Sequence, residues 1–254
     1  MITIKSKTEF DTMRRAGRLV AETLDKLQHA VKPGMTTGDL DKIAYEHITR
    51  SHGIPSFKGY PPGSQRPFPA SICTSVNEEV VHGIPSKRRV LEEGDIVSID
   101  CGAIIDGWHG DAAVTVPVGQ IPAEVQRLLD VTRDSLHKGV EQVLPGNHIG
   151  DVSAAIQRFA EGQGFSVVRE YVGHGIGRQM HEDPQVPNWG TPGRGMLLKE
   201  GMALALEPMI NAGTADVRVL KDQWTVVTKD GQRSAHFEHT VALTDNGPEI
   251  LTKL

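Results

Sequence analysis

The chain contains one pattern twice, and this duplication restricts the folds that are open to it. The segment Val31–Leu40 resembles the segment Val143–Val152, and each copy places a Pro-Gly pair between two stretches of periodic apolar residues. Apolar residues at three- and four-residue spacing predict amphipathic helices before and after each pair. The third of these helices is expected to have Pro122 at its first position, which suits proline. A helix, a turn and a second helix therefore occur once in each half of the chain.

The strand signals follow the same duplication. The segment Glu93–Asp100 resembles the segment Glu200–Glu207, and in both a stretch of strand formers ends in an acidic residue. Equivalent carboxylates predict two halves related by a pseudo-twofold axis, each built from two helices and antiparallel strands, with a site between them. No Ser- or Gly-rich linker separates the halves. We therefore expect an α/β fold in a single domain over residues 1–254, with internal halves of roughly 1–120 and 121–254.

A β-hairpin is predicted around the dipeptide Asp106-Gly107, a strong two-residue turn signal with strand formers on both sides. With these two residues as the loop, Asp100 faces Ala113 and shares a sheet face with Asp111. The backbones of the two acids would then lie about 7–8 Å apart as diagonal neighbours. That separation lets both carboxylates hold one cluster of metal ions.

Metal-binding side chains recur at the ends of several predicted strands. They are Asp100, Asp111, His174, Glu207 and Glu238. Four carboxylates and one imidazole form the set that holds one or two divalent cations for hydrolysis rather than a structural zinc. Such cations lower the pKa of a bound water toward about 7. The alternative is that Asp100 and Asp111 are ordinary acids that face solvent. Their apolar neighbours, such as Ile99 and Ala112, are not typical of a solvated surface.

Most of the 11 histidines are expected to lie at the surface or to cap helices. His174 differs, because a glycine on either side of it leaves room for close approach of another backbone segment. His109 and His239 adjoin candidate ligands and are expected either to support them or to serve the fold. His82 is expected to be presented on a tight turn that the following Gly83 permits.

The composition excludes several classes of protein. A net charge of -5 with no long basic run gives no case for binding nucleic acid or an anionic membrane surface. No stretch of about 20 apolar residues could span a bilayer, and the start of the chain lacks the apolar run of a signal peptide. Cys73 and Cys101 form no disulfide framework. A cytoplasmic protein without a membrane partner is expected.

Several motifs of the chain occur together in one known family. They lie in Phe68–Pro85, in Ser98–Asp111, in Tyr171–Gly177 with His181, in Leu206–Pro208 and in Phe237–Thr240. In these segments, and over nearly its whole length, the chain resembles the prokaryotic type I methionine aminopeptidases. The resemblance implies the pita-bread fold and a metal-dependent hydrolase. Such an enzyme removes the initiator methionine from nascent proteins and peptides with a small second residue, by two-metal hydrolysis of the first peptide bond.

The resemblance also implies a role for each site residue. One metal is expected on Asp111, His174, Glu207 and Glu238, and the other on Asp100, Asp111 and Glu238. Glu207 is expected to act in addition as general base. His181 is the expected hydrogen-bond donor to the scissile carbonyl, and His82 is expected to contact the scissile nitrogen or the reaction intermediate. Two divalent ions of Co, Mn, Fe or Zn are expected, because all of them tolerate this ligand set.

Substrate specificity is expected from an apolar pocket sized for a thioether. The family's pocket positions correspond to Tyr60, Phe68, Cys73 and Trp224, with Phe57 and Met180 at lining positions, and His82 and His181 are also expected to contact substrate. Sulfur and aromatic groups suit methionine, whose sulfur gains about 0.3–1.5 kcal/mol from a ring contact. Two features depart from the family and bear on substrate preference. The segment 61–67 is longer than usual, and Met180 stands where an aromatic residue is common.

Two other interpretations stay open. A prolidase-like or Xaa-Pro aminopeptidase shares the fold and the metals but usually carries an additional N-terminal domain, whereas the first amphipathic helix begins here near Phe10. A non-catalytic binding module of the same fold is the second alternative, and its members have lost ligands. An assay of methionyl against Xaa-Pro peptides, with and without metal, separates the three.

The partners that the resemblance implies are the N-termini of nascent polypeptides at the ribosome. The enzyme is expected to be a monomer. The second residue of this chain is Ile2. A β-branched side chain at that position would overfill the space near the metals, at a typical cost of about 1–3 kcal/mol. The chain is therefore expected to retain Met1 and not to process itself.

Overall fold

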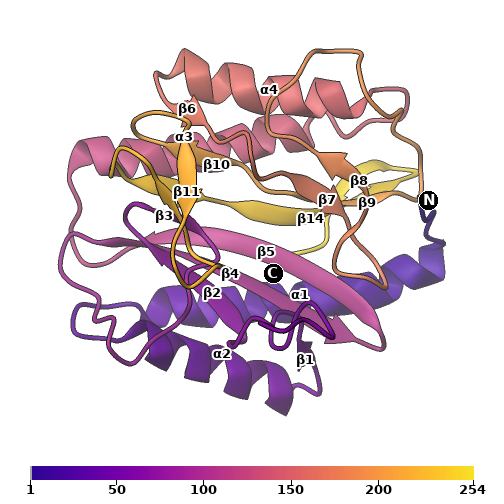
Figure 1. Ribbon diagram of the computed structural model, residues 1–254. Helices are drawn as coiled ribbons and strands as arrows, with labels where there is room; N and C mark the ends of the chain where they lie inside the picture. Colours follow the sequence, from indigo (N-terminus) through magenta and orange to yellow (C-terminus); the bar gives the residue numbers. More distant parts are fainter. Residues whose placement is uncertain (1) are drawn as a thin grey trace.

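The computed structural model describes residues 2–254, so the expected retention of Met1 lies outside the described residues. Figure 1 shows the helices in two groups, one on either side of the strands. The first pair is α1 (Lys7–Ala30) and α2 (Thr37–Arg50), and the second is α3 (Ala123–Val140) and α4 (Ile149–Gly162). The predicted duplication of helix, turn and helix is thus confirmed.

Local sequence explains where the helices begin. Ser6 and Glu9 form a capping box at the start of α1, and Thr36 and Asp39 form another at the start of α2. Pro122 was expected at the first position of α3 and is instead its N-cap, because its ψ of 150° is extended rather than helical. The boundary prediction is therefore wrong by one residue.

One antiparallel sheet passes through both halves of the chain. Its strands are β1 (Ile54–Pro55), β2 (Ile72–Val76), β4 (Ile96–Ile105), β5 (Trp108–Pro117), β7 (Gly173–Gly175), β8 (Glu182–Val186), β9 (Ala203–Leu206), β14 (Glu238–Thr244) and β15 (Gly247–Ile250). The order is β1-β4-β5-β14-β9-β7-β8, with β2 beside β4 and β15 beside β14. The arrangement is symmetric about β5 and β14, because β4 and β9 flank that pair and β2 and β7 come next. This order fits the predicted pseudo-twofold relationship.

The predicted hairpin is confirmed in both its turn and its register. Asp106 and Gly107 are the two loop residues, with φ of 50° and 79°, as a two-residue hairpin turn requires. Asp100 pairs with Ala113, and Asp111 pairs with Gly102, two positions after Asp100. The two acids are therefore diagonal neighbours on one face of the sheet.

Two small sheets complete the strands. The first contains β6 (Ser166–Val167), β10 (Met209–Asn211) and β13 (Ser234–His236), and the second contains β3 (Glu79–Val81), β11 (Val217–Val219) and β12 (Val226–Thr228). Pro208 has no N–H for a ladder and separates β9 of the large sheet from β10. Among residues 2–254, no helix is long and apolar enough to cross a bilayer.

The large sheet is curled, so both helix pairs pack against the same face of it and determine which side chains face the other way. Ile99 and Ala112 belong to the core under α1 and α2, and Leu206 belongs to the core under α4. Because side chains alternate along a strand, the adjacent residues Asp100 and Asp111 face the opposite side of the sheet. Each fully buried aliphatic side chain contributes about 1.5–3 kcal/mol, so the apolar cores fix this choice of face for the acids.

Candidate metal centre

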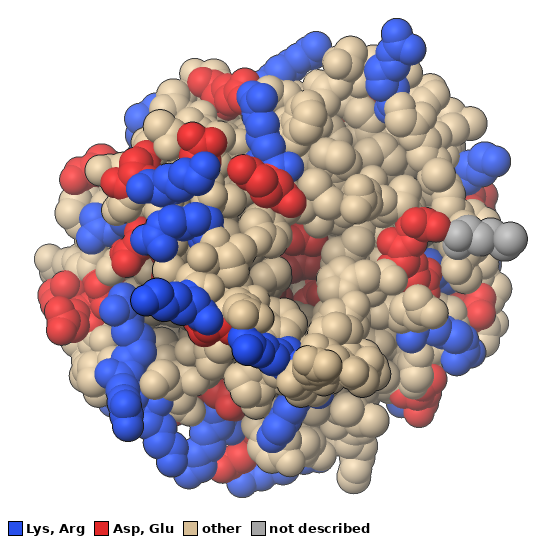
Figure 2. Space-filling view, viewed as in Figure 1, with Lys and Arg blue, Asp and Glu red and all other residues tan. Residues whose placement is uncertain are grey.

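A cavity of about 360 Å³ lies over the sheet face that the helices leave open. Every residue predicted as a ligand, a catalytic group or a substrate contact lines it, namely Asp100, Asp111, His174, Glu207, Glu238, His82, His181, Tyr60, Phe68, Cys73, Met180 and Trp224. Figure 2 shows acidic side chains recessed in a hollow near the centre of the viewed face. The cavity thus has one acidic region and one apolar region.

The first row of site residues crosses four neighbouring strands. Cys73 pairs with Asp100, Asp100 pairs with Ala113, and Ala113 pairs with Glu238. The pairing of β9 with β14, continued by one residue beyond β9, places Glu207 next to Glu238. Because the side chain of Ala113 is only a methyl group, the space between the carboxylates of Asp100 and Glu238 stays open.

The second row lies one side-chain repeat away on the same face. Asp111 is bonded through its backbone to the hydroxyl of Thr240. Thr240 pairs with Ala205, and Ala205 pairs with His174. The two rows run side by side, so their acidic and imidazole groups converge from β4, β5, β7, β14 and the end of β9. Strand pairing, rather than proximity in sequence, assembles the site.

The acidic cluster fits a divalent cation. Asp100 Oδ1, Asp111 Oδ1 and Glu238 Oε1 are buried without a hydrogen-bond partner, although buried polar atoms in proteins are normally paired. Ligand atoms of Asp111, His174 and Glu238 lie within 4.8 Å of one another. Hard oxygen donors with one imidazole suit divalent metal ions, and a cation would satisfy the orphaned acceptors.

The carboxyl groups are perturbed by their surroundings. Burial raises the pKa of Asp111 to about 7. Burial and the neighbouring charge of Asp111 raise the pKa of Asp100, of Glu207 and of Glu238 well above their ordinary values. Without a cation the cluster therefore retains protons near neutral pH, because several carboxylates cannot all be ionised in one enclosed space.

His174 is held in the form of a metal ligand. Burial, with a smaller effect of His181, lowers the pKa of His174 to about 3, so the ring is neutral. Its Nδ1 lies 2.8 Å from its acceptor, the carbonyl oxygen of Gly175, which assigns the proton to Nδ1 and leaves the lone pair on Nε2. Nε2 lies 3.6 Å from Glu207 Oε1, so the free nitrogen faces the carboxylates.

The glycines beside His174 have the predicted role of allowing close approach. A Cβ atom at Gly173 would collide with the carbonyl oxygen of Ala205, and one at Gly175 would collide with that of Asp183. Any larger residue at either position would push β7 away from a neighbouring strand. This would move the imidazole of His174 out of its row.

His82 and His181 flank the acidic cluster. The rings of His181 and His174 have centroids 4.3 Å apart, and His181 Nδ1 lies 2.6 Å from the hydroxyl of Tyr60. His82 itself has a φ of 61°, which is a strained conformation for a residue with a side chain. The positive φ of the turn thus belongs to His82 and not to Gly83. Gly83 permits the turn as expected, because a Cβ there would collide with the carbonyl of Thr74.

The apolar region of the cavity is a compact cluster. Its buried members include Phe57, Phe68, Cys73 and Met180, and Tyr60 and Trp224 are among the partly buried residues packed against them. Phe68 and Trp224 pack edge to face with centroids 5.2 Å apart, a favourable arrangement for aromatic rings. Burial raises the pKa of the Cys73 thiol well above its ordinary value, so this cysteine is an apolar wall rather than a nucleophile.

The segment 61–67 begins at the cavity, which Pro61 lines. Its residues are exposed, while the backbone on either side is closed by two hydrogen bonds, from Gly59 N to Phe68 O at 2.9 Å and from Phe68 N to Tyr60 O at 2.7 Å. The segment therefore leaves the two pocket aromatics Tyr60 and Phe68 in the lining of the cavity.

Two supporting residues were missed from the sequence. Thr240 stands two positions after Glu238 on the same strand, so strand alternation could have revealed it. Asn188 donates its side-chain N–H to the carbonyl of Glu207 at 3.0 Å, but it lies in a loop without any pattern that points to the site. His239, by contrast, is directed to Thr252 on the helix side of the sheet and serves the fold.

Comparison with known proteins decides the family. A model of the metallopeptidase family M24 matches residues 11–245 of the chain. The chain belongs to metallopeptidase family M24. It is 58% identical to the methionine aminopeptidase of Clostridium acetobutylicum, over 99% of each chain. A crystal structure of methionine aminopeptidase from Thermotoga maritima matches this M24 chain with a TM-score of 0.97 at 48% identity, over 100% of both chains.

At lower identity the likeness to solved structures concerns the fold alone. An Xaa-Pro dipeptidase from Bacillus anthracis matches with a TM-score of 0.75 at 20% identity, over 99% of this chain but 62% of that one. The pita-bread fold, the resemblance to type I methionine aminopeptidases and the classification as a hydrolase are thus confirmed. The comparisons favour a methionine aminopeptidase over a prolidase-like enzyme.

Proposed function

We propose that this M24 peptidase removes the N-terminal methionine from nascent polypeptides with a small second residue, as a monomer and single catalytic domain in the cytoplasm, where chains leave the ribosome. One observation carries this proposal. An apolar recess walled by Phe68, Met180 and Trp224 opens directly onto the five candidate ligands in one cavity. An extended methionine side chain in that recess would place the first peptide bond beside the carboxylates.

The ligand set supports two divalent ions of Co, Mn, Fe or Zn. We assign Asp111, His174, Glu207 and Glu238 to one ion and Asp100, Asp111 and Glu238 to the other, so each ion would draw on side chains of both rows. Bound ions of this kind supply a water whose pKa is lowered toward about 7, and they polarise a carbonyl oxygen. The remaining steps belong to side chains of the protein.

Glu207 is the proposed general base. Its carboxylate lies beside the lone pair of His174, at 3.6 Å from Nε2, and burial raises its pKa well above the ordinary value of a glutamate. A raised pKa suits a group that must accept a proton from the attacking water and then pass one to the leaving amine. The hydrogen bond from the Asn188 side chain to the backbone carbonyl of Glu207 holds the end of β9 in place for this transfer.

His181 is the proposed donor to the scissile carbonyl oxygen. Burial lowers its pKa, so the imidazole is neutral near pH 7 and carries one N–H. When the hydroxyl of Tyr60 donates to Nδ1 across 2.6 Å, the proton of His181 lies on Nε2. His82 is the second proposed contact to the reacting peptide bond, and burial lowers its pKa to about 4, so it also acts as a neutral imidazole.

A panel of peptides tests this function. Peptides beginning Met-Ala, Met-Ile and Ala-Pro are incubated with the metal-loaded protein, and the release of free amino acids is measured. Hydrolysis of Met-Ala well above both others is the expected result, because the peptide bond must approach the ligands closely. Preferential cleavage of the Xaa-Pro peptide would contradict the proposal and favour the prolidase-like alternative.

A further inference from the structure

Lys5 carries a charge that is almost completely buried outside the acidic cluster. Its side chain is 2% exposed, and its Nζ lies 2.8 Å from Glu182 Oε2, on a side chain that is 9% exposed. The neighbouring pair of Lys7 and Asp245 is at the surface, with side chains 81% and 44% exposed. Burying an ion pair carries a large desolvation cost and is weak support for stability. A role in local geometry is a better explanation for the pair of Lys5 and Glu182.

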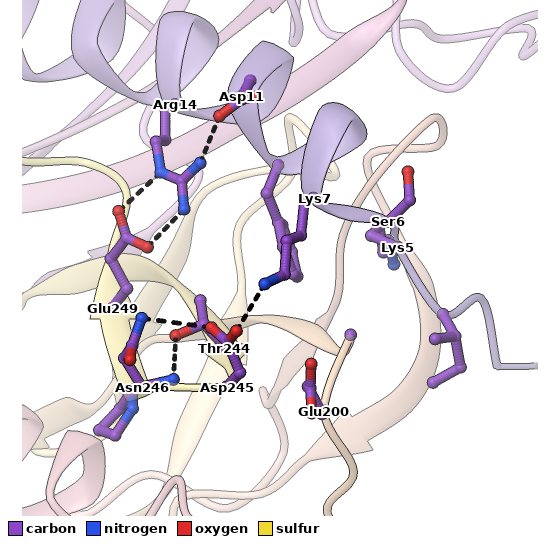
Figure 3. A pocket seen from close by; sticks show the side chains of 14 residues that line it. Lys5, Ser6, Lys7, Asp11, Arg14, Glu200, Thr244, Asp245, Asn246 and Glu249 are labelled. Atoms are coloured by element: carbon purple, nitrogen blue, oxygen red, sulfur yellow. Dashed lines mark hydrogen bonds and ion pairs between the residues drawn. The ribbon is translucent and has the colours of Figure 1, made fainter.

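The backbone of Lys5 is fixed as firmly as its side chain. Its N–H donates to the carbonyl of Gly201 at 2.7 Å, just before β9. Figure 3 shows a pocket that this segment lines, where Lys7 reaches across to Asp245 while no interaction line joins Lys5 to any residue drawn. The ammonium of Lys5 instead forms its ion pair with Glu182, far away in sequence.

Glu182 closes the loop that carries two cavity residues. It pairs with Gly175 across β7 and β8, so the loop between them is residues 176–181 and contains Met180 and His181. Glu182 Oε1 accepts a hydrogen bond from the backbone N–H of Gln179 at 3.2 Å. Burial by itself would raise the pKa of Glu182, but the bonds from Lys5 and Gln179 outweigh it and lower the pKa.

The residues around this ion pair are tightly packed. A Cβ atom at Gly177 would lie 2.6 Å from Glu182 Oε1 and 2.8 Å from Lys5 Cε. The carbonyl of Gly177 in turn accepts the N–H of His109 on β5 at 2.9 Å. The loop is therefore held between β5 on one side and the ion pair on the other.

We propose that Lys5 is a positioning residue, whose ammonium holds the Glu182 carboxylate and thereby fixes the loop 176–181 with His181 and Met180 facing the cavity. The inference rests on the proposed function, in which His181 contacts the scissile carbonyl. Without the ammonium, the carboxylate of Glu182 turns toward water and releases the N–H of Gln179. A displacement of about 1 Å at a reacting group can cost about 10²-fold in rate.

The test uses variants of the full chain loaded with metal. Lys5→Met removes the charge and keeps the length of the side chain, whereas Lys5→Arg keeps the charge. Glu182→Gln keeps an oxygen for the N–H of Gln179 but ends the ion pair. Lys7→Met is the matched control, because the same change in the same segment removes only an exposed pair. For each variant, kcat and KM are measured with a methionyl peptide substrate. Metal affinity is measured by calorimetry, and the unfolding temperature is measured on the protein alone.

Lys5→Met and Glu182→Gln are each expected to lower kcat by about 10- to 100-fold, with smaller changes in KM and unchanged metal affinity. Lys5→Arg is expected to retain most of kcat and Lys7→Met all of it. The double variant of Lys5 and Glu182 is expected to be no worse than the single variants, because both remove one interaction.

Wild-type kcat in folded Lys5→Met, or a loss of activity that only follows the unfolded fraction, would overturn the positioning role. A wild-type protein that releases no methionine would contradict the proposed function itself, so the two failures are distinguishable.

Discussion

The hydroxyl of Thr240 makes two hydrogen bonds to the backbone of Asp111. It accepts from the amide at 3.0 Å and donates to the carbonyl at 2.8 Å. A side chain on β14 thus replaces the ladder bonds that a backbone neighbour would make to β5. Since Asp111 is one of the two residues assigned to both ions, the hydroxyl orients a proposed shared ligand of the site.

Thr240→Val is expected to weaken metal binding by about 10- to 100-fold, the effect typical of lost groups that orient a ligand. The isosteric change leaves the amide and carbonyl of Asp111 unpaired in a buried place, which costs about 1–3 kcal/mol per group in stability. Titration calorimetry with a divalent metal measures the affinity. Thr240→Ser keeps the hydroxyl and is the control. Equal affinities in Thr240→Val and Thr240→Ser would show that the hydroxyl does not orient Asp111.

Glu207→Gln is expected to lower kcat by at least the roughly 10²–10⁴ attributed to positioned acid-base catalysis, because it removes both a base and a ligand charge. Steady-state kinetics on a methionyl peptide with saturating metal measures the effect. Glu200→Gln, an exposed position before the same strand, is the control and is expected to leave kcat unchanged. If Glu207→Gln matched wild-type kcat, Glu207 would not be the base.

Phe68→Ala is expected to raise KM for methionyl peptides more than it lowers kcat. The ring binds the substrate side chain equally in the ground state and in the transition state, so its loss weakens uniform binding. Phe165→Ala removes a half-buried ring outside the cavity and is expected to leave both constants unchanged. A fall in kcat at constant KM in Phe68→Ala would assign Phe68 to the scaffold.

Metal affinity is expected to rise with pH. The pKa of Asp111 is raised to about 7, and those of the other carboxyls are raised as well, so protons occupy the metal-free cluster up to neutral pH. A cation must displace them, which makes binding weaker as the pH falls and releases protons on binding. Calorimetry in buffers of different ionisation enthalpy counts these protons. Proton release that fails to decrease between about pH 6 and pH 8 would contradict the raised pKa values.

The parts of the site that lie close together in sequence could be predicted without a structure. The turn at Asp106-Gly107 fixes the register of its own hairpin, so the shared face of Asp100 and Asp111 follows from residue numbers alone. Glu238 is different. Its pairing with Ala113 joins segments that no local rule connects, and only its motif suggested it as a ligand.

Supporting residues were harder to predict than ligands. Asn188 and Lys5 act through a backbone carbonyl and a buried ion pair with residues distant in sequence. Neither has a residue type or spacing that marks it as part of a site, because asparagine and lysine are common at surfaces. Their roles depend on how loops pack, and loop packing is determined by tertiary contacts. Family resemblance therefore indicated the groups proposed for chemistry, and the structure indicated the groups that position them.

The most direct test of the central claim is methionine release by the chain after exhaustive removal of metal. A metal-free sample, verified by elemental analysis, is assayed on a Met-Ala peptide before and after a divalent ion is added back. The expected result is no detectable release without metal and recovery of activity with it, because the bound ions are proposed to activate the water and to polarise the carbonyl. Full activity in the verified metal-free sample would contradict the account.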